Sequence, residues 1–238
     1  MNNKMTVSSI INDALSIVSK YPMIILIFLI PGIVSMLGGF AIAGGAGAIG
    51  TVGEFTVEDG QFDFGSFLPG LLGATALLTI VVSILSILVG AVAIVMTSDA
   101  WEQREVDLGR AFDTIKDKIV LLIVASIVLA VLQFIGLLAC CVGLIVVVIV
   151  TVFVIQGIVL DDLPLTDSFR NSFDLAKKVW PDILILYIIA FLASVILGLI
   201  PFIGALIGEL VTGFFTVGFT IYYIGLTRMP PVEPMPEE

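Results

Sequence analysis

The sequence predicts an all-α membrane protein whose six transmembrane helices form three hairpins, each preceded by a cytoplasmic interfacial amphipathic helix. Three observations predict this fold: an excess of apolar residues that only lipid can cover, uncharged segments long enough to cross a bilayer, and a one-sided distribution of Lys and Arg. We expect residues 1–238 to form a single membrane domain.

The composition separates this chain from soluble proteins. Of its 238 residues, 59% are hydrophobic and 13% are charged, whereas a soluble domain carries roughly 45–50% apolar and about 25% charged residues. The net charge of −10 argues against nucleic acid as a partner, because neutralising phosphates needs clustered Lys and Arg. The chain has no histidine and only two cysteines, the adjacent Cys140 and Cys141. We therefore expect no disulfide framework, no metal and no cofactor.

Uncharged segments define the spans, because about 20 apolar residues cross ~30 Å of hydrocarbon. Two segments are long enough for one span each. Two others are about twice that length and are interrupted, one between Gly136 and Gly143 and one from Gly198 to Pro201, so we interpret each as two spans joined by a tight turn. The six predicted spans are residues 22–43, 68–96, 119–138, 143–160, 182–199 and 202–226.

The first span has an alternative interpretation as a cleaved signal peptide. The segment before it is some 22 residues long and contains Asp13. A signal peptide has a short basic leader and an apolar core of about 7–15 residues. We favour a retained span.

The basic residues predict the orientation. Once the six spans are threaded, every Lys and Arg falls on one side: Lys4, Lys20, Arg104, Arg110, Lys116, Lys118, Arg170, Lys177, Lys178 and Arg228. Basic residues collect in cytoplasmic loops, so both termini are predicted to be cytoplasmic in the cell membrane. Aromatic residues are expected at the inner headgroup layer: Tyr21, Trp101, Trp180, Tyr222 and Tyr223.

An amphipathic segment precedes each odd-numbered span, at about 5–20, 100–118 and 166–179. Apolar residues recur in each at i, i+4, i+7 and i+11, which is one stripe of an α-helix. The stripes are Ile10, Ala14, Ile17 and Tyr21; Leu108, Phe112, Ile115 and Ile119; and Phe169, Phe173, Ala176 and Trp180. Such helices lie in the membrane interface with the apolar face inward. The pattern has two interpretations. Either the chain contains three copies of one unit, an interfacial helix followed by a membrane hairpin, or any helix next to a membrane span has such a stripe.

Two segments outside the spans have their own predictions. The outer loop, 44–67, contains Asp59-Gly60, a preferred hairpin turn. We predict a small β-hairpin over 54–64, whose acidic face is a solvated surface or, less favoured, a cation site. The Pro-rich tail 228–238 is predicted to be disordered.

Glu209 is the ionisable residue that lies deepest in a predicted span, roughly 10–12 Å from the outer turn. An intramembrane acid is a candidate functional site, with Gln133 as a candidate partner at similar depth. The competing interpretation is structural: interhelical hydrogen bonding, or a carboxylate reaching outward. Gly204 and Gly208, four residues apart, predict close helix packing. No nucleotide-binding, nucleophile or metal-ligand motif is present, so we expect no enzyme.

Two Phe-Asp steps, Phe112-Asp113 and Phe173-Asp174, each lead from an interfacial segment into an apolar hairpin. This pattern, over most of residues 5–226, resembles the polytopic membrane domain fused to some bacterial glycerophosphodiester phosphodiesterases, and its stand-alone prokaryotic relatives. The catalytic barrel is not included in these 238 residues. The resemblance therefore implies a membrane module and carries over no activity.

Two functional hypotheses follow. The first is a non-enzymatic module that organises membrane lipids or a partner, either another membrane protein or a second copy of the chain. The second is a small transporter or channel that uses Glu209 and Gln133.

Overall fold

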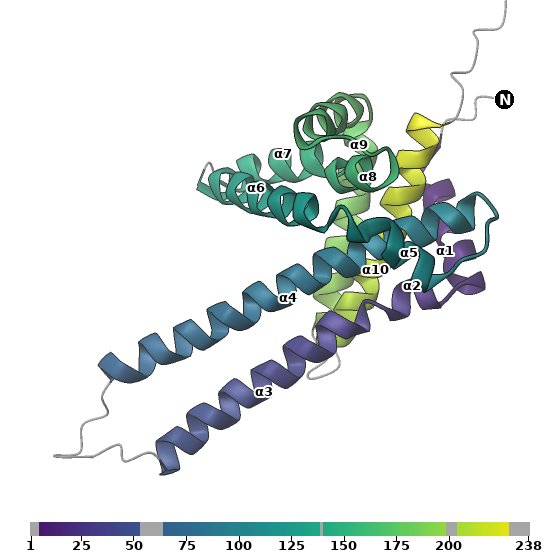
Figure 1. Ribbon diagram of the computed structural model, residues 1–238. Helices are drawn as coiled ribbons and strands as arrows, with labels where there is room; N and C mark the ends of the chain where they lie inside the picture. The colour runs from purple at the N-terminus through teal and green to yellow at the C-terminus, as the bar shows by residue number, and fades with distance from the viewer. Residues whose placement is uncertain (1–4, 53–63, 139, 199–203, 229–238) are drawn as a thin grey trace, which may run out of the picture.

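A computed structural model of the protein describes residues 5–52, 64–138, 140–198 and 204–228. The described residues are predominantly helical and include no strand, and six of their helical stretches are long and apolar enough to span a membrane. The prediction of an all-α, multi-pass membrane protein is confirmed. The helices (Figure 1) are α1 (Val7–Lys20), α2 (Met23–Leu26), α3 (Leu29–Val52), α4 (Phe64–Trp101), α5 (Leu108–Lys116), α6 (Ile119–Leu138), α7 (Cys140–Thr151), α8 (Val154–Leu160), α9 (Leu165–Gly198) and α10 (Gly204–Thr227).

Most predicted spans agree with the observed helices, and α6 has the same ends as the predicted third span. The outer loop was predicted too long: α3 continues to Val52 and α4 begins at Phe64, so 44–52 and 64–67 are helical. The predicted β-hairpin at 54–64 lies outside the described residues except for Phe64, and the tail 228–238 does so except for Arg228.

Two spans contain breaks or kinks that have a local cause. Ile27 and Phe28 separate α2 from α3, because Pro31 has no N–H for the Ile27 carbonyl and its ring crowds that oxygen. In α9, Val179 leaves the helical conformation (φ −129°, ψ 20°) two residues before Pro181. The chain therefore bends just before Pro181, and the amphipathic segment and the span form one kinked helix.

A third break, between α7 and α8, is stabilised by a side chain from another helix. The backbone N–H of Phe153 donates to Ser172 Oγ (3.1 Å), and Ser172 Oγ donates to the carbonyl of Val150 (2.7 Å). Both Ser172 and Phe153 are fully buried. Since buried backbone polar groups need partners, one hydroxyl of α9 satisfies two groups that the break sets free.

The last helix, α10, lies at the centre of the bundle. It packs against α1, α2, α3, α4 and α9, whereas α6 packs on α7, α4 and α8. Within the span window of α10, 56% of residues are buried, against 17% in α6. Figure 1 shows α3 and α4 running side by side away from the bundle, while α6 and α7 leave it in another direction.

The buried core is concentrated at one end of the spans. Its side chains come from 89–96 of α4, 153–159 of α7–α8 and 215–224 of α10. We call this the basic end, because the spans end here at Trp101, Ile119, Leu160 and Thr227, beside Lys and Arg. Towards the other end large apolar side chains are exposed, such as Leu77, Phe134 and Phe191. That half of the molecule therefore faces lipid.

The first amphipathic helix covers protein instead of lipid. Ile10 and Ala14 of α1 are fully buried, and an added Cβ at Gly218 of α10 would lie 3.6 Å from Ile10 Cγ2. The stripe is therefore the buried face, as predicted, but the surface that it covers is α10.

Partial burial raises the pKa of the neighbouring Asp13 carboxyl.

The stripes predicted in the other two segments were wrong in part. The predicted helix 100–118 is reduced to α5, whose buried side chains are Ala111 and Ile115, while Phe112 is 52% exposed. In α9, Ser172 and Ala176 are buried and Phe173 is 51% exposed. Small residues take the buried positions because they let helices approach closely. The three segments thus share a pair of buried residues four positions apart. In α5 and α9 the first residue of this pair is followed directly by an exposed Phe and an Asp.

Candidate functional site

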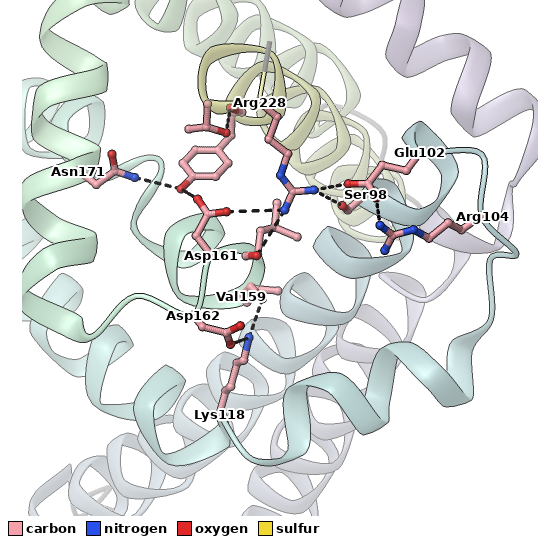
Figure 2. A network of polar contacts seen from close by, with 12 residues as sticks. Ser98, Glu102, Arg104, Lys118, Val159, Asp161, Asp162, Asn171 and Arg228 are labelled. Carbon is pink, nitrogen blue, oxygen red and sulfur yellow. Dashed lines mark hydrogen bonds and ion pairs between the residues drawn. The ribbon is translucent and has the colours of Figure 1, made fainter. Parts of the chain in front are cut away.

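Charged side chains at the basic end join helix ends that are far apart in the sequence. Four spans have one end here: Asp99 lies in the last turn of α4, Lys118 directly precedes α6, Asp161 follows α8 and Arg228 follows α10. Figure 2 shows Lys118, Asp161 and Arg228 in this network of polar contacts. The local sequence explains this, since each apolar run stops at a charged residue that cannot enter lipid without a partner.

Arg228 connects α4, α8 and α10. Its guanidinium pairs with Glu102 and lies 3.6 Å from Asp161 Oδ1. It also donates to Ser98 Oγ (3.5 Å) and to the carbonyl of Leu160 (3.3 Å), as Figure 2 shows. The planar fork of Arg suits several acceptors at once, so this residue closes the bundle at the end of α10.

Two adjacent tyrosines extend the network to α9. The Tyr223 hydroxyl donates to Asp161 and accepts a hydrogen bond from Asn171 Nδ2 (3.0 Å). The Tyr222 hydroxyl donates to Asp182 Oδ2 (2.8 Å). Both tyrosines are buried, so they face the protein interior, and their depth at the inner headgroup layer stays a prediction. Each ring is in the core and its hydroxyl reaches a carboxylate on a neighbouring segment.

Asp99 is the most buried acid of the network, at 3% exposure. Its Oδ1 pairs with Arg110 and lies 3.8 Å from Arg104 Nη1, and Arg104 also pairs with Glu102. Its Oδ2 is buried and has no hydrogen-bond partner among the described residues. Buried polar atoms nearly always have partners, so this oxygen is an unused acceptor.

Lys118 lines the same pocket as Asp99, and only 17% of its side chain is exposed. Its ammonium pairs with Asp162 and donates to the carbonyl of Val159 (2.7 Å). That carbonyl belongs to the last turn of α8, where backbone oxygens lack helical donors. Lys118 therefore ties the start of α6 to the end of α8.

These groups surround a pocket of about 290 Å³, which we call the basic-end pocket. Its apolar walls include Val95 and Leu160. Its charged lining residues are Asp99, Arg104, Arg110, Lys118, Asp162 and Arg228. Chemically, the pocket offers guanidinium and ammonium donors together with one unpaired carboxylate oxygen.

The structure does not bring the predicted pair Glu209 and Gln133 together. Glu209 is half-buried on α10 and packs on α3, where an added Cβ at Gly32 would lie 3.0 Å from Glu209 Cγ. Gln133 is exposed on α6. Within the described part of the chain, no hydrogen bond or ion pair joins the two side chains.

The predicted close packing at Gly204 and Gly208 is not seen at the second glycine. An added Cβ at Gly208 would meet no heavy atom within 4 Å. Gly204 begins α10. Close approaches on α10 are instead at Gly213, where an added Cβ would lie 2.7 Å from Phe28 Cδ2, and at Gly225, where it would meet Met5.

Sequence reasoning missed the basic-end pocket because its charges, mixed in sign, suggested solvated helix faces. One signal was present: Ser98-Asp99 precedes Trp101 inside the last helical turn of a long apolar run. An acid at that place needs a partner from another segment. Which segment supplies it depends on the tertiary structure.

Comparisons with protein-family models, curated proteins and solved structures found no match to this chain.

Proposed function

We propose that the protein is a non-enzymatic membrane module that organises lipids or a partner protein at the inner leaflet of the cell membrane. One observation carries this proposal: Phe112 and Phe173 are 52% and 51% exposed on the amphipathic segments at the basic end. Trp180, farther along the second segment, is 53% exposed. Exposed aromatic rings at the end of membrane spans are suited to the headgroup layer.

The sequence around the two phenylalanines supports a surface function. Each is followed by Asp and, four residues later, by Lys: Lys116 after Phe112 and Lys177 after Phe173. An apolar ring that enters the interface beside a Lys that reaches anionic headgroups is the arrangement of interfacial helices. The resemblance to a membrane domain without its own catalytic residues supports the same proposal.

The proposed orientation places both termini in the cytoplasm. The charge distribution supports it, since the described Lys and Arg cluster near the basic end. Green fluorescent protein fused after Glu238 should therefore fluoresce, and alkaline phosphatase at the same place should be inactive. The same two reporters inserted at Gly60 should give the opposite result. An active phosphatase at the C-terminus would reverse the orientation.

If the protein organises lipids or a partner, specific lipids or proteins should be enriched around it, and this enrichment should depend on the exposed Phe rings. The full chain is extracted in native nanodiscs, and its lipids and proteins are quantified by mass spectrometry against the bulk membrane. We expect at least one lipid class or protein to be enriched in the wild type. The variant Phe112→Ala/Phe173→Ala should lose about half of that enrichment or more, since each substitution removes a large apolar contact.

The matched control is Phe134→Ala/Phe191→Ala, which removes two exposed rings near the opposite end of the spans. It should keep the enrichment. Equal losses in the two variants would contradict a function of the basic end. A proton-coupled flux in proteoliposomes that Glu209→Gln abolishes without unfolding would establish the transporter hypothesis instead.

A further inference from the structure

The basic-end pocket lies at the depth of lipid phosphates. Asp99 is in the last turn of one span, Lys118 directly precedes another, and Arg228 directly follows a third. The ends of spans lie where hydrocarbon gives way to headgroups. A lipid in the adjoining leaflet therefore has its phosphate at the level of this pocket.

The charge of the pocket favours an anion. Four of its lining side chains are cationic and two are carboxylates, so its lining carries two excess positive charges in a chain of net charge −10. Glu102 and Asp161 balance this excess from outside the lining, through Arg104 and Arg228. The side chains of Arg104 and Arg228 are 58% and 36% exposed, so water screens these pairs. Arg and Lys form strong charge-assisted hydrogen bonds with phosphate.

The unpaired oxygen of Asp99 adds a second requirement. Asp99 lines the pocket, and its buried Oδ2 accepts no hydrogen bond from a described residue. A phosphate has no donor to offer it at neutral pH, so the ligand needs a donor next to its phosphate. An ammonium would face four cationic side chains. A neutral hydroxyl meets the requirement without that repulsion.

We propose that the basic-end pocket binds the headgroup of an anionic phospholipid whose phosphate carries a hydroxyl-bearing alcohol. Arg104, Arg110 and Lys118 bind the phosphate oxygens, and the hydroxyl donates to Asp99 Oδ2. The pocket of about 290 Å³ has the volume of about ten water molecules, which suffices for a small headgroup. This inference rests on the proposed function and names its lipid class.

Three lipids with different headgroups test which headgroup the wild-type protein prefers. The purified full chain is exchanged into detergent with equal amounts of phosphatidylglycerol, phosphatidylethanol or phosphatidylcholine, and retained lipids are counted by native mass spectrometry. Phosphatidylethanol has the same charge as phosphatidylglycerol but lacks its hydroxyls. We expect phosphatidylglycerol to be retained about tenfold more than either of the other lipids, as one lost hydrogen bond to a charged group predicts.

A pair of variants tests whether the lipid binds in the basic-end pocket. Arg110→Gln/Lys118→Gln removes two cations of the pocket, and Arg170→Gln/Lys178→Gln removes the same charges from outside it. Only the first should lose the preference for phosphatidylglycerol, by about tenfold. Thermal unfolding of both variants checks that they are folded, and the three-lipid comparison needs no variant.

Several results would overturn the proposal. Equal retention of phosphatidylglycerol and phosphatidylcholine would exclude an anion site, and equal retention of phosphatidylglycerol and phosphatidylethanol would exclude the hydroxyl contact to Asp99. Displacement of phosphatidylglycerol by an equimolar amount of inorganic phosphate would make this a site for free phosphate. None of these results affects the Phe112→Ala/Phe173→Ala experiment, so the two proposals fail independently.

Discussion

Replacing Phe153 with alanine should lower the free energy of unfolding by about 3 kcal/mol, the lower end of the range for a buried Phe. The side chain is fully buried at the break between α7 and α8. Its ring centre lies 6.2 Å from that of Tyr222 and 5.7 Å from that of Tyr223. We expect the lower end of that range because lipid is as apolar as the protein core, so moving the ring out of the core costs little transfer free energy. Most of the lost stability then comes from the cavity and the lost packing contacts.

The measurement is unfolding of the purified chain in mixed micelles by a denaturing detergent, followed by circular dichroism. Phe191→Ala is the matched control, because Phe191 is 67% exposed on α9. It should change the unfolding free energy by less than about 0.5 kcal/mol. If both variants lose the same stability, the ring of Phe153 is not part of a packed core.

Replacing Gly136 with valine should destabilise the α6–α7 hairpin by about 1–3 kcal/mol, because it overfills a packed contact. An added Cβ at Gly136 would lie 3.0 Å from the carbonyl oxygen of Gly143 and 3.1 Å from the Cα of Leu144. Both are backbone atoms of α7, so neither can move by changing a rotamer. The two helices must separate to make room.

Gly90→Val is the control for this substitution. It makes the same chemical change inside α4, where an added Cβ would meet no heavy atom within 4 Å. Both variants are compared by the same detergent unfolding. A loss at Gly136 that does not exceed the loss at Gly90 would contradict the close approach of α6 and α7.

Hydropathy was sufficient to predict the six spans, because a membrane helix requires a length of apolar sequence that few other structures need. It could not predict the break at Phe153. No Gly or Pro stands there, and the hydroxyl that stabilises the break comes from Ser172, 19 residues later. Such a contact depends on how α9 packs against α7 and α8.

The amphipathic stripes show a different limit. Periodicity identified helices, but the choice of buried face assumed that the largest apolar side chains are inside. Phe112 and Phe173 point outward while Ala111 and Ser172 are buried. In water that assumption holds, because burial of apolar area drives folding. Beside a bilayer an aromatic ring also has a favourable place outside the protein.

The candidate site was less predictable than the fold. Glu209 stood out because it is an isolated acid in an apolar span, whereas Asp99 and Arg228 lie at span ends, where charge is common. Arg228 pairs with Glu102, three residues after Asp99, across 126 residues of sequence. Only the tertiary structure shows that four span ends meet around one pocket.

The central position of α10 has a consequence for biosynthesis. The helix on which α1, α3, α4 and α9 pack is synthesised after all four of them. At ~5–20 residues per second, roughly 10–40 s pass between the synthesis of α1 and that of α10. During this interval the buried face of α1, with Ile10 and Ala14, lacks its main packing partner. The contacts that α1, α3, α4 and α9 make with α10 can therefore form only after α10 has been inserted.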